Sequence, residues 1–419
     1  MHTIVIINPG HFHAGLVLRE THPQLSKDVY IYSEAGQDLD SYMRLVESFN
    51  NRSENPTDWK FHVYAAPDFM EKAVAEKKGD IAILAGKNNQ KIYYIEKLHN
   101  AGFKVLSDKP LTINDDGVKV LERVLSTEPV VMDIMTERHE ITSLIQKDLI
   151  KDLDVFGKFR VTEGEPTIVK ESIHHLYKTV NGAPLVRPPW YFDVNVQGEG
   201  IVDVTTHLAD LAQWMLFPGD SINFTKDIQL QMAKHWTTDI PLDKFHLVTK
   251  KDAFPESVAD SVKDNVLKLL CNGEFIYKIK GIPVKLVVIW NLQAAPGGGD
   301  THFSVMKGSK SDLIIEQGPE TGFKPELYVK PHFCMDAMEA DLKAAIASQG
   351  RKDVTVVRED DCFRIDIPAK YRTTHEEHFA EVRNDFLEML DTGKVPADLK
   401  SNLLAKYSLL AAARGKAAS

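Results

Sequence analysis

Three residues of this chain combine the side-chain types that oxidise or reduce a hydroxyl group. Asp203 and His207 are four positions apart, so on a helix they would share one face. A histidine can take the proton of a hydroxyl while hydride leaves the same carbon, and an aspartate can orient the imidazole. Lys109 follows the strand-like segment 104–107, and the carboxyl end of a parallel strand faces the crevice where such sheets bind ligands. We therefore expect Lys109, Asp203 and His207 to form a catalytic set in which Lys109 polarises the oxygen.

Each of these residues also has a purely structural interpretation. Lys109 precedes Pro110 and could be a surface lysine in a turn. Asp203 could stabilise a helix N-terminus, and His207 could fill the core beneath it.

The loop after the first strand-like segment, 3–7, has the position of a dinucleotide-binding loop. Such a loop needs a tight turn and a close approach of phosphate to the backbone, and its usual glycines are here Asn8, Gly10 and His13. Asparagine tolerates the left-handed backbone of a tight turn. Glu34, after the second segment, can bind the ribose hydroxyls and repel a 2′-phosphate, which favours NAD over NADP; alternatively it is a solvated loop acid. The expected cofactor contacts are Asn8, Gly10, His11, Phe12, His13, Ser33, Glu34, Gly86, Lys87, Asn88, Asp108 and Lys109.

The elements that must position these residues change in kind along the chain. In the first 135 residues, strand-like segments (3–7, 29–32, 61–64, 81–84, 104–107 and 130–133) alternate with helix-like ones (12–21, 67–78, 91–101 and 117–125). This α/β rhythm predicts a Rossmann domain, 1–135, with a doubly wound parallel sheet. Further on, strands are expected without helices between them, at 159–163, 228–233, 266–270, 275–280, 284–291, 304–308, 312–317, 326–329 and 353–358. They predict an α+β domain, 136–419, with a large, mainly antiparallel open sheet and helices at 203–216, 335–347 and 375–390.

Composition excludes several classes of function. The 419 residues carry 50 Lys and Arg against 60 Asp and Glu, a net charge of −10 with no basic run, which argues against nucleic-acid binding. Three scattered cysteines indicate a reducing compartment rather than a disulfide framework. We find no signal peptide and no apolar run of membrane-spanning length, so a cytoplasmic protein with no membrane partner is expected.

Four segments resemble the Gfo/Idh/MocA oxidoreductases. Segment 101–110, AGFKVLSDKP, is similar to the family's AGKxVxxEKP signature, and segment 198–210, GEGIVDVTTHLAD, resembles its GGGxxxDxxxHxxD motif. The aromatic run 190–193 and the C-terminal segment 375–396 fit more loosely. The chain departs from the pattern in three places: Asp108 replaces a glutamate, segment 86–91 (GKNNQK) lacks the family's Pro and His, and the first loop is poor in glycine.

The resemblance implies an NAD-dependent oxidoreductase that acts on a secondary hydroxyl of a sugar, glycoside or cyclitol. It also implies a homo-oligomer formed through the sheet of the second domain. Two other functions remain open: a lyase or hydrolase that uses tightly bound NAD for transient oxidation, and a non-catalytic protein that senses nucleotides.

Further side chains suit a sugar or polyol, which is bound by paired donors and acceptors and by aromatic faces. His174 and His175 should point to opposite faces of a strand, so they cannot share a metal ion. His375 and His378 lack a third ligand, so no metal is expected there either. We expect His375 and His378 to lie near the substrate or on the surface. Glu137 could bind a polyol or form an ordinary ion pair. The expected substrate contacts are Glu137, Arg187, Trp190, Tyr191, Asp203 and His207.

Overall fold

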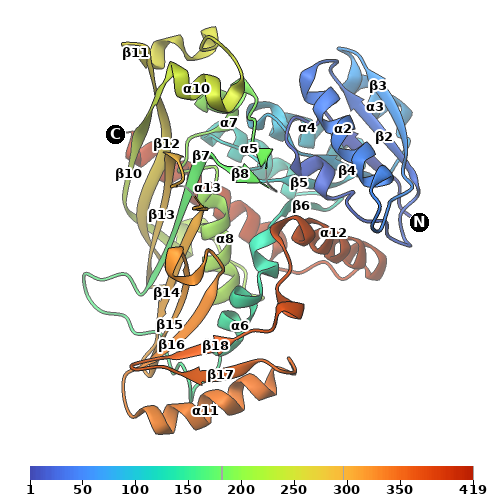
Figure 1. Ribbon diagram of the computed structural model, residues 1–419. Coiled ribbons are helices and arrows are strands. Elements are labelled where there is room, and N and C mark those ends of the chain that lie inside the picture. The colour runs from blue at the N-terminus through green and yellow to red at the C-terminus, as the bar shows by residue number, and fades with distance from the viewer. Residues whose placement is uncertain (181–182, 296, 419) are drawn as a thin grey trace.

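Two sheets built from successive parts of the chain organise the fold (Figure 1). The computed structural model describes residues 1–180, 183–295 and 297–418. Within these ranges, no helix is long and apolar enough to cross a membrane.

The first sheet is parallel and has the strand order β3-β2-β1-β4-β5-β6 of a Rossmann fold. The side chains of β1 alternate between two cores, with Val5 and Ile7 in one and Ile4 and Ile6 in the other. Both faces are therefore buried, which explains the almost continuous apolar strands. The strands are β1 Ile4–Ile7, β2 Asp28–Ser33, β3 Lys60–Ala65, β4 Ile81–Leu84, β5 Lys104–Asp108 and β6 Val131–Ile134. The helices between them are α1 His13–Leu16, α2 Gln37–Asn51, α3 Phe69–Glu76, α4 Asn88–Asn100 and α5 Asp115–Leu125.

The helix expected at 12–21 is much shorter, because α1 contains only four residues. Leu16, Val17 and Leu18 are buried in succession, a pattern that a regular helix on a sheet does not produce. The long helix α2, which follows β2, was not predicted. The face that α1 covers only in part is completed by α12, His375–Thr392, whose Phe379 and Phe386 lie in the same core as Ile4 and Ile6.

The second sheet is large and mostly antiparallel, as expected, in the order β10-β12-β13-β7-β14-β15-β16-β18-β17. Its strands are β7 Ile168–Tyr177, β10 Ile228–Pro241, β11 Val262–Lys263 (beside β12), β12 Val266–Ile279, β13 Ile282–Gln293, β14 Thr301–Lys307, β15 Ser311–Gln317, β16 Glu326–Pro331, β17 Thr355–Arg358 and β18 Phe363–Asp366. A separate two-stranded sheet pairs β8 Thr179–Val180 with β9 Ala183–Pro184. The remaining α-helices are α6 Ile141–Leu149, α7 Val194–Gln197, α8 Thr205–Leu216, α9 Phe224–Asp227, α10 Leu242–Thr249, α11 Met335–Ser348 and α13 Leu399–Ala417.

Two predictions for this sheet are wrong, and two of its strands, β7 and β18, were not among those predicted. Segment 159–163 is not a strand, because only an isolated bridge joins Phe159 to Gly308. The two strands expected at 266–270 and 275–280 are one strand, β12, in which Gly273 continues the pairing with β10 and β13. The central strand β7 was not among the strands expected for the sheet, although His174 and His175 were placed on a strand, because the polar residues of its inner face interrupt the apolar alternation.

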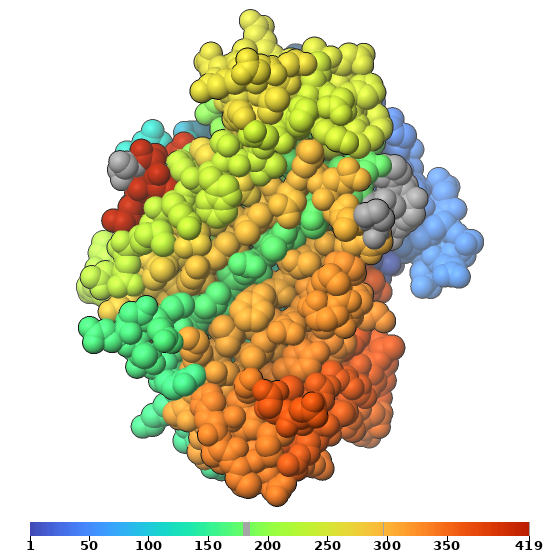
Figure 2. Space-filling view, turned by 60° about the vertical axis from the view of Figure 1, so that its left-hand side comes forward, coloured from blue at the N-terminus to red at the C-terminus, as the bar shows by residue number. Residues whose placement is uncertain are grey.

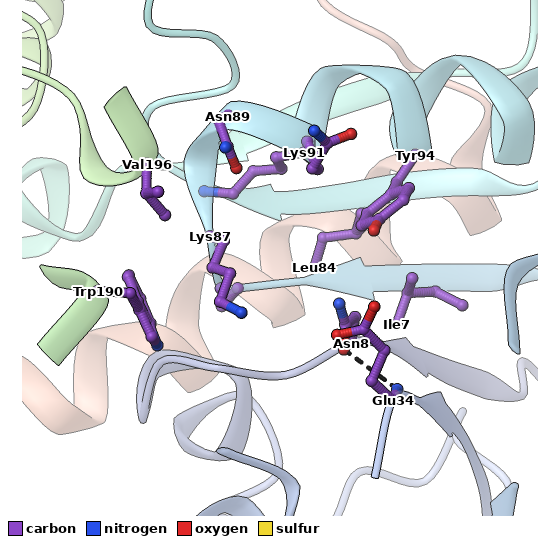
Figure 3. Close-up of a pocket in the computed structure, with 13 residues that line it drawn as sticks. Ile7, Asn8, Glu34, Leu84, Lys87, Asn89, Lys91, Tyr94, Trp190 and Val196 are labelled. Carbon is purple, nitrogen blue, oxygen red and sulfur yellow. Dashed lines mark hydrogen bonds between the residues drawn. The ribbon is translucent and has the colours of Figure 1, made fainter. Parts of the chain in front are cut away.

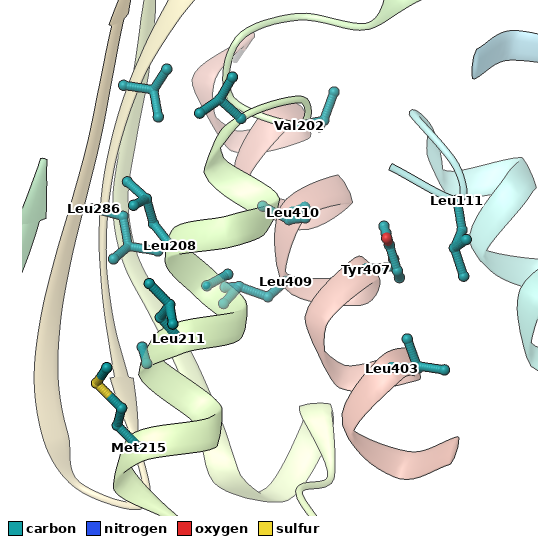
Figure 4. Packing of buried hydrophobic residues seen from close by; sticks show 14 of the residues in the cluster. Leu111, Val202, Leu208, Leu211, Met215, Leu286, Leu403, Tyr407, Leu409 and Leu410 are labelled. Carbon is teal, nitrogen blue, oxygen red and sulfur yellow. The ribbon is translucent and has the colours of Figure 1, made fainter. Parts of the chain in front are cut away.

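Helix α8 lies between the second sheet and α13 (Figure 4). Leu208 and Met215 of α8 belong to the same buried core as Leu286 of β13, and Leu409 and Leu410 of α13 join that core. The helix begins at Thr205, so Asp203 lies in the turn before it rather than in the predicted helix. Figure 2 shows the opposite face of the sheet, across which the long strands run side by side.

Candidate active site

The centre of the site is an ion pair between residues that the sequence separates by 94 positions. Lys109 follows β5 directly, and its Nζ lies 2.7 Å from Asp203 Oδ1. Gln197 Nε2 donates to the other oxygen of Asp203 at 3.1 Å. Only 10% of the Lys109 side chain and 7% of the Asp203 side chain is exposed, so water screens the pair weakly. The fold thus brings an ammonium from the first sheet to a carboxylate beside the second.

His207 lies in the first turn of α8, close enough to Lys109 for their charges to interact. Burial and the ammonium of Lys109 hold the pKa of His207 well below its usual range. Its Nδ1 is shielded from solvent and has no hydrogen-bond partner among the described residues. The imidazole is therefore neutral near pH 7 and has a nitrogen that can accept a proton.

A second lysine holds the turn that carries Lys109. Lys91 on α4 is buried, and its Nζ donates to Asn88 Oδ1 at 2.6 Å and to the carbonyls of Asp108 and Pro110 at 3.0 and 3.2 Å. Burial lowers the pKa of Lys91 to about 8. Asn88 also donates to the carbonyl of Gln197, which positions the amide that contacts Asp203. Asn88 was expected to contact the cofactor. In the structure its side chain bonds Lys91 and the carbonyl of Gln197.

A cavity of about 310 Å³ lies at the carboxyl ends of β1, β2 and β4 (Figure 3). Asn8, Glu34, Gly86 and Lys87 line it together with Trp190. Asn8 has the positive φ, 43°, that the tight turn was expected to need. Its Oδ1 accepts hydrogen bonds from Ser33 Oγ and from the backbone of Glu34, which ties the ends of β1 and β2 together.

The loop after β1 lies directly on the loop after β4. The N–H groups of Gly10 and His11 both donate to the carbonyl of Ala85, at 3.0 and 3.2 Å. A Cβ atom on Gly86 would lie 2.8 Å from the carbonyl oxygen of Asn8, so only glycine fits there. Phe12, the residue before α1, is 41% exposed.

The wall opposite Lys109 comes from the inner face of the second sheet. Lys170 on β7 is fully buried, its Nζ lies 2.9 Å from Ser304 Oγ, and burial lowers its pKa to about 7. Glu137 interacts electrostatically with both Lys109 and Lys170, and the surrounding protein and Glu140 raise its pKa to about 7. Its side chain is 39% exposed, so the carboxyl group is still reached by solvent.

Asp300 brings two histidines and a lysine together on this wall. Its carboxylate lies 3.1 Å from His174 Nδ1, 3.3 Å from His175 Nδ1 and within hydrogen-bond distance of Lys178 Nζ. The expectation that His174 and His175 point to opposite faces is wrong, because the pairing of β7 with β14 ends at Ile173 and both rings turn to Asp300.

The aromatic residues expected to bind substrate divide between two places. Tyr191 and Trp290 stack on the guanidinium of Arg187, which donates to the carbonyls of Leu176 and His175. Trp190 instead lines the cavity of Figure 3, where its Nε1 donates to Asp38 at 3.0 Å.

The histidines of the C-terminal segment, His375 and His378, also have different surroundings. His375 Nδ1 lies 3.6 Å from Glu137 Oε1. His378 is buried and bonded to Thr373, so it is not a surface residue.

Comparison with known proteins agrees with this arrangement. Residues 145–418 match the family model described as "Putative oxidoreductase C terminal domain". The fold, with a Rossmann sheet and a large open sheet, is that of the Gfo/Idh/MocA oxidoreductases, as the motifs predicted. The chain belongs to the family of that model, the oxidoreductases that share this C-terminal domain. No match was found among the curated proteins.

Solved structures extend over the whole chain. A "putative oxidoreductase" from Parabacteroides merdae is 46% identical, with a TM-score of 0.96 over 100% of this chain and 97% of that one. Levoglucosan dehydrogenase in complex with NADH and L-sorbose is 13% identical, with a TM-score of 0.65 over 100% and 97%. A 3-ketoreductase from Actinomadura kijaniata, in complex with TDP-benzene and NADP, is 14% identical, with a TM-score of 0.61 over 99% and 97%. The last two resemble this chain in fold.

Proposed function

We propose that this chain is a nicotinamide-dinucleotide-dependent dehydrogenase of the cytoplasm that acts on a secondary hydroxyl of a sugar, glycoside or cyclitol. The observation that carries the proposal is the buried pair of Lys109 and Asp203, with the neutral imidazole of His207 beside it. An ammonium held by a carboxylate can stabilise a developing alkoxide, and a neutral imidazole can take its proton.

The cavity at the carboxyl ends of β1, β2 and β4 fits the adenosine end of a dinucleotide. Glu34 would bind the ribose hydroxyls, Ser33 and Asn8 would hold the loop that carries it, and Lys87 would meet the phosphates from the loop after β4. When bound, the nicotinamide supplies the hydride acceptor. The carboxylate of Glu34 favours NAD over NADP because it would repel a 2′-phosphate.

The chain's own residues then divide the work. Lys109 polarises the substrate oxygen, Asp203 keeps that ammonium charged and in place, and His207 accepts the proton through a ring nitrogen. Glu137 and the polar inner face of β7 supply the hydrogen-bonding groups that a polyol needs. The outer face of the second sheet is the surface through which we propose that copies of the chain associate.

The direct test is a mass analysis of any nucleotide that the purified protein carries, followed by addition of sugars, glycosides and cyclitols. We expect NAD to bind and NADH absorbance to grow with one class of substrate. Cleavage of a glycoside without free NADH would replace this proposal with the lyase or hydrolase alternative. A protein that binds no dinucleotide would contradict both.

Replacing Glu34 with serine is expected to weaken NAD binding about 10- to 100-fold, because hydrogen bonds to a charged carboxylate are lost. The preference over NADP should shrink at the same time, since the repulsion of the 2′-phosphate disappears. Quenching of tryptophan fluorescence measures both dissociation constants, because Trp190 lines the cavity. The control is Glu47→Ser on the exposed side of α2, which should leave both constants unchanged. Equal NAD affinity in the two variants would remove Glu34 from the site.

The dependence of kcat/KM on pH should report the unusual state of His207. Only the neutral imidazole accepts a proton, and burial and Lys109 lower its pKa, so activity should persist well below pH 6.5. An acid limb at or above pH 6.5 would contradict this role. The variant Glu137→Gln serves as the comparison. The pKa of Glu137 is raised to about 7, so this carboxyl group could add its own limb to the pH profile. That limb must be absent from the profile of the variant.

A further inference from the structure

Two imidazoles and a carboxylate meet at residues that the sequence suggested as cofactor contacts and to which the reaction proposed above gives no role. His11 and His13 come from the loop and first turn after β1, and Asp108 is the last residue of β5. One possible ligand atom from each lies within 4.8 Å of the others. His13 Nδ1 is 3.0 Å from Asp108 Oδ2, and His11 Nδ1 is 3.7 Å from the same oxygen.

The unusual member of this cluster is His11. Its Nδ1 is shielded from solvent and has no hydrogen-bond partner among the described residues, although it faces a carboxylate. A separation of 3.7 Å is too long for a hydrogen bond, and a buried nitrogen left without a partner is costly. His13 and Asp108 alone form a normal hydrogen-bonded pair and do not explain why a second imidazole is directed at the same oxygen.

The distances from Asp108 Oδ2 to the two imidazoles suit a shared metal ion. Around a tetrahedral ion with bonds of about 2.0–2.2 Å, neighbouring donor atoms are about 3.4 Å apart. The separations of 3.0 and 3.7 Å from Asp108 Oδ2 lie on either side of that value. Two imidazoles with one carboxylate suit Zn²⁺ and other first-row transition ions, whereas Mg²⁺ and Ca²⁺ prefer all-oxygen sites.

We propose that His11, His13 and Asp108 bind one divalent transition ion, with at least one coordination position left for water or another ligand. The site goes beyond the proposed dehydrogenase function and does not depend on the identity of the dinucleotide or the sugar. Asp108 and Lys109 are consecutive, so a bound ion would lie beside the catalytic turn and add positive charge to it. The sequence suggested metal ligands only in the pairs His174/His175 and His375/His378, because Asp108 is 95 residues from His13 and no local spacing joins them.

The test uses the full-length protein, stripped with a chelator and then titrated with Co²⁺ and with Zn²⁺. Tetrahedral Co²⁺ absorbs visible light, so its spectrum reports the coordination directly, and calorimetry gives the Zn²⁺ affinity and stoichiometry. We expect one equivalent of each ion. The variant His11→Asn should bind at least about 10²-fold more weakly, since loss of outer-sphere partners alone costs 10- to 100-fold. His13→Asn should lose the site as well.

His11→Asn separates this proposal from a structural role, because His11 Nδ1 has no hydrogen bond among the described residues that the variant could break. Its urea unfolding midpoint should therefore match that of the wild type, while metal affinity falls. The control is His62→Asn. His62 is an exposed histidine 2.7 Å from Asp28, and among the described residues no second imidazole is paired with that carboxylate. This variant should leave metal binding unchanged. A wild type without a tetrahedral Co²⁺ spectrum, or a His11→Asn variant with wild-type affinity, would overturn the proposal.

Discussion

Replacing Lys109 with methionine is expected to lower turnover by about 10²-fold or more, with NAD affinity nearly unchanged. The physical reason is that the variant loses the ammonium that stabilises charge on the substrate oxygen but keeps the length of the side chain. Asp203 still has the amide of Gln197 as a partner, so the turn before α8 should remain in place. Steady-state rates with the substrate found in the panel, and the NAD dissociation constant, measure the two effects separately.

Lys104→Met is the matched control for this experiment. Lys104 begins the same strand, β5, and its Nζ also pairs with an aspartate, Asp80, at 3.0 Å. It lies at the amino end of the strand, away from the crevice where ligands bind, so turnover should stay at the wild-type level. A comparable loss in both variants would mean that Lys109 acts only by holding β5, and the catalytic role would be wrong.

The largest expected effect on stability comes from a buried charge network beneath α8. Lys406 on α13 lies 2.8 Å from Asp133 and 2.7 Å from Asp210, and Arg138 binds both oxygens of Asp210. The Lys406 side chain is only 2% exposed. Lys406→Met keeps the volume but leaves two buried carboxylates short of a cation, which should cost about 3–5 kcal/mol of the free energy of unfolding. Urea unfolding followed by circular dichroism measures the loss.

Lys400→Met tests whether the cost comes from burial. Lys400 is on the same helix, and its Nζ lies 2.6 Å from the exposed carboxylate of Glu128. Surface pairs contribute little, so this variant should lose no more than about 1 kcal/mol. If the two variants lost the same amount, the network around Lys406 would not hold α13 against α8.

Local sequence suggests the three residues that we propose as the catalytic centre, Lys109, Asp203 and His207. The Asp-Lys-Pro turn follows an apolar strand, and Asp203 and His207 are close in the chain, so family motifs identified all three before their positions were known. The residues around them were not predictable in the same way. Lys91 marked a departure from the family pattern, yet it bonds the backbone on both sides of Lys109.

The parallel first sheet was predictable from the sequence, since strands buried on both faces must be apolar throughout, and so was the mostly antiparallel second sheet. The course of β7 through the sheet is visible only in the folded protein, because a strand that lines a polar cleft lacks the alternation that identifies strands. Only the tertiary structure placed α12 over the face that α1 leaves open, and brought His11 and His13 to Asp108. Contacts between residues so far apart depend on sheet register and on how helices pack, and no local pattern of residues encodes either.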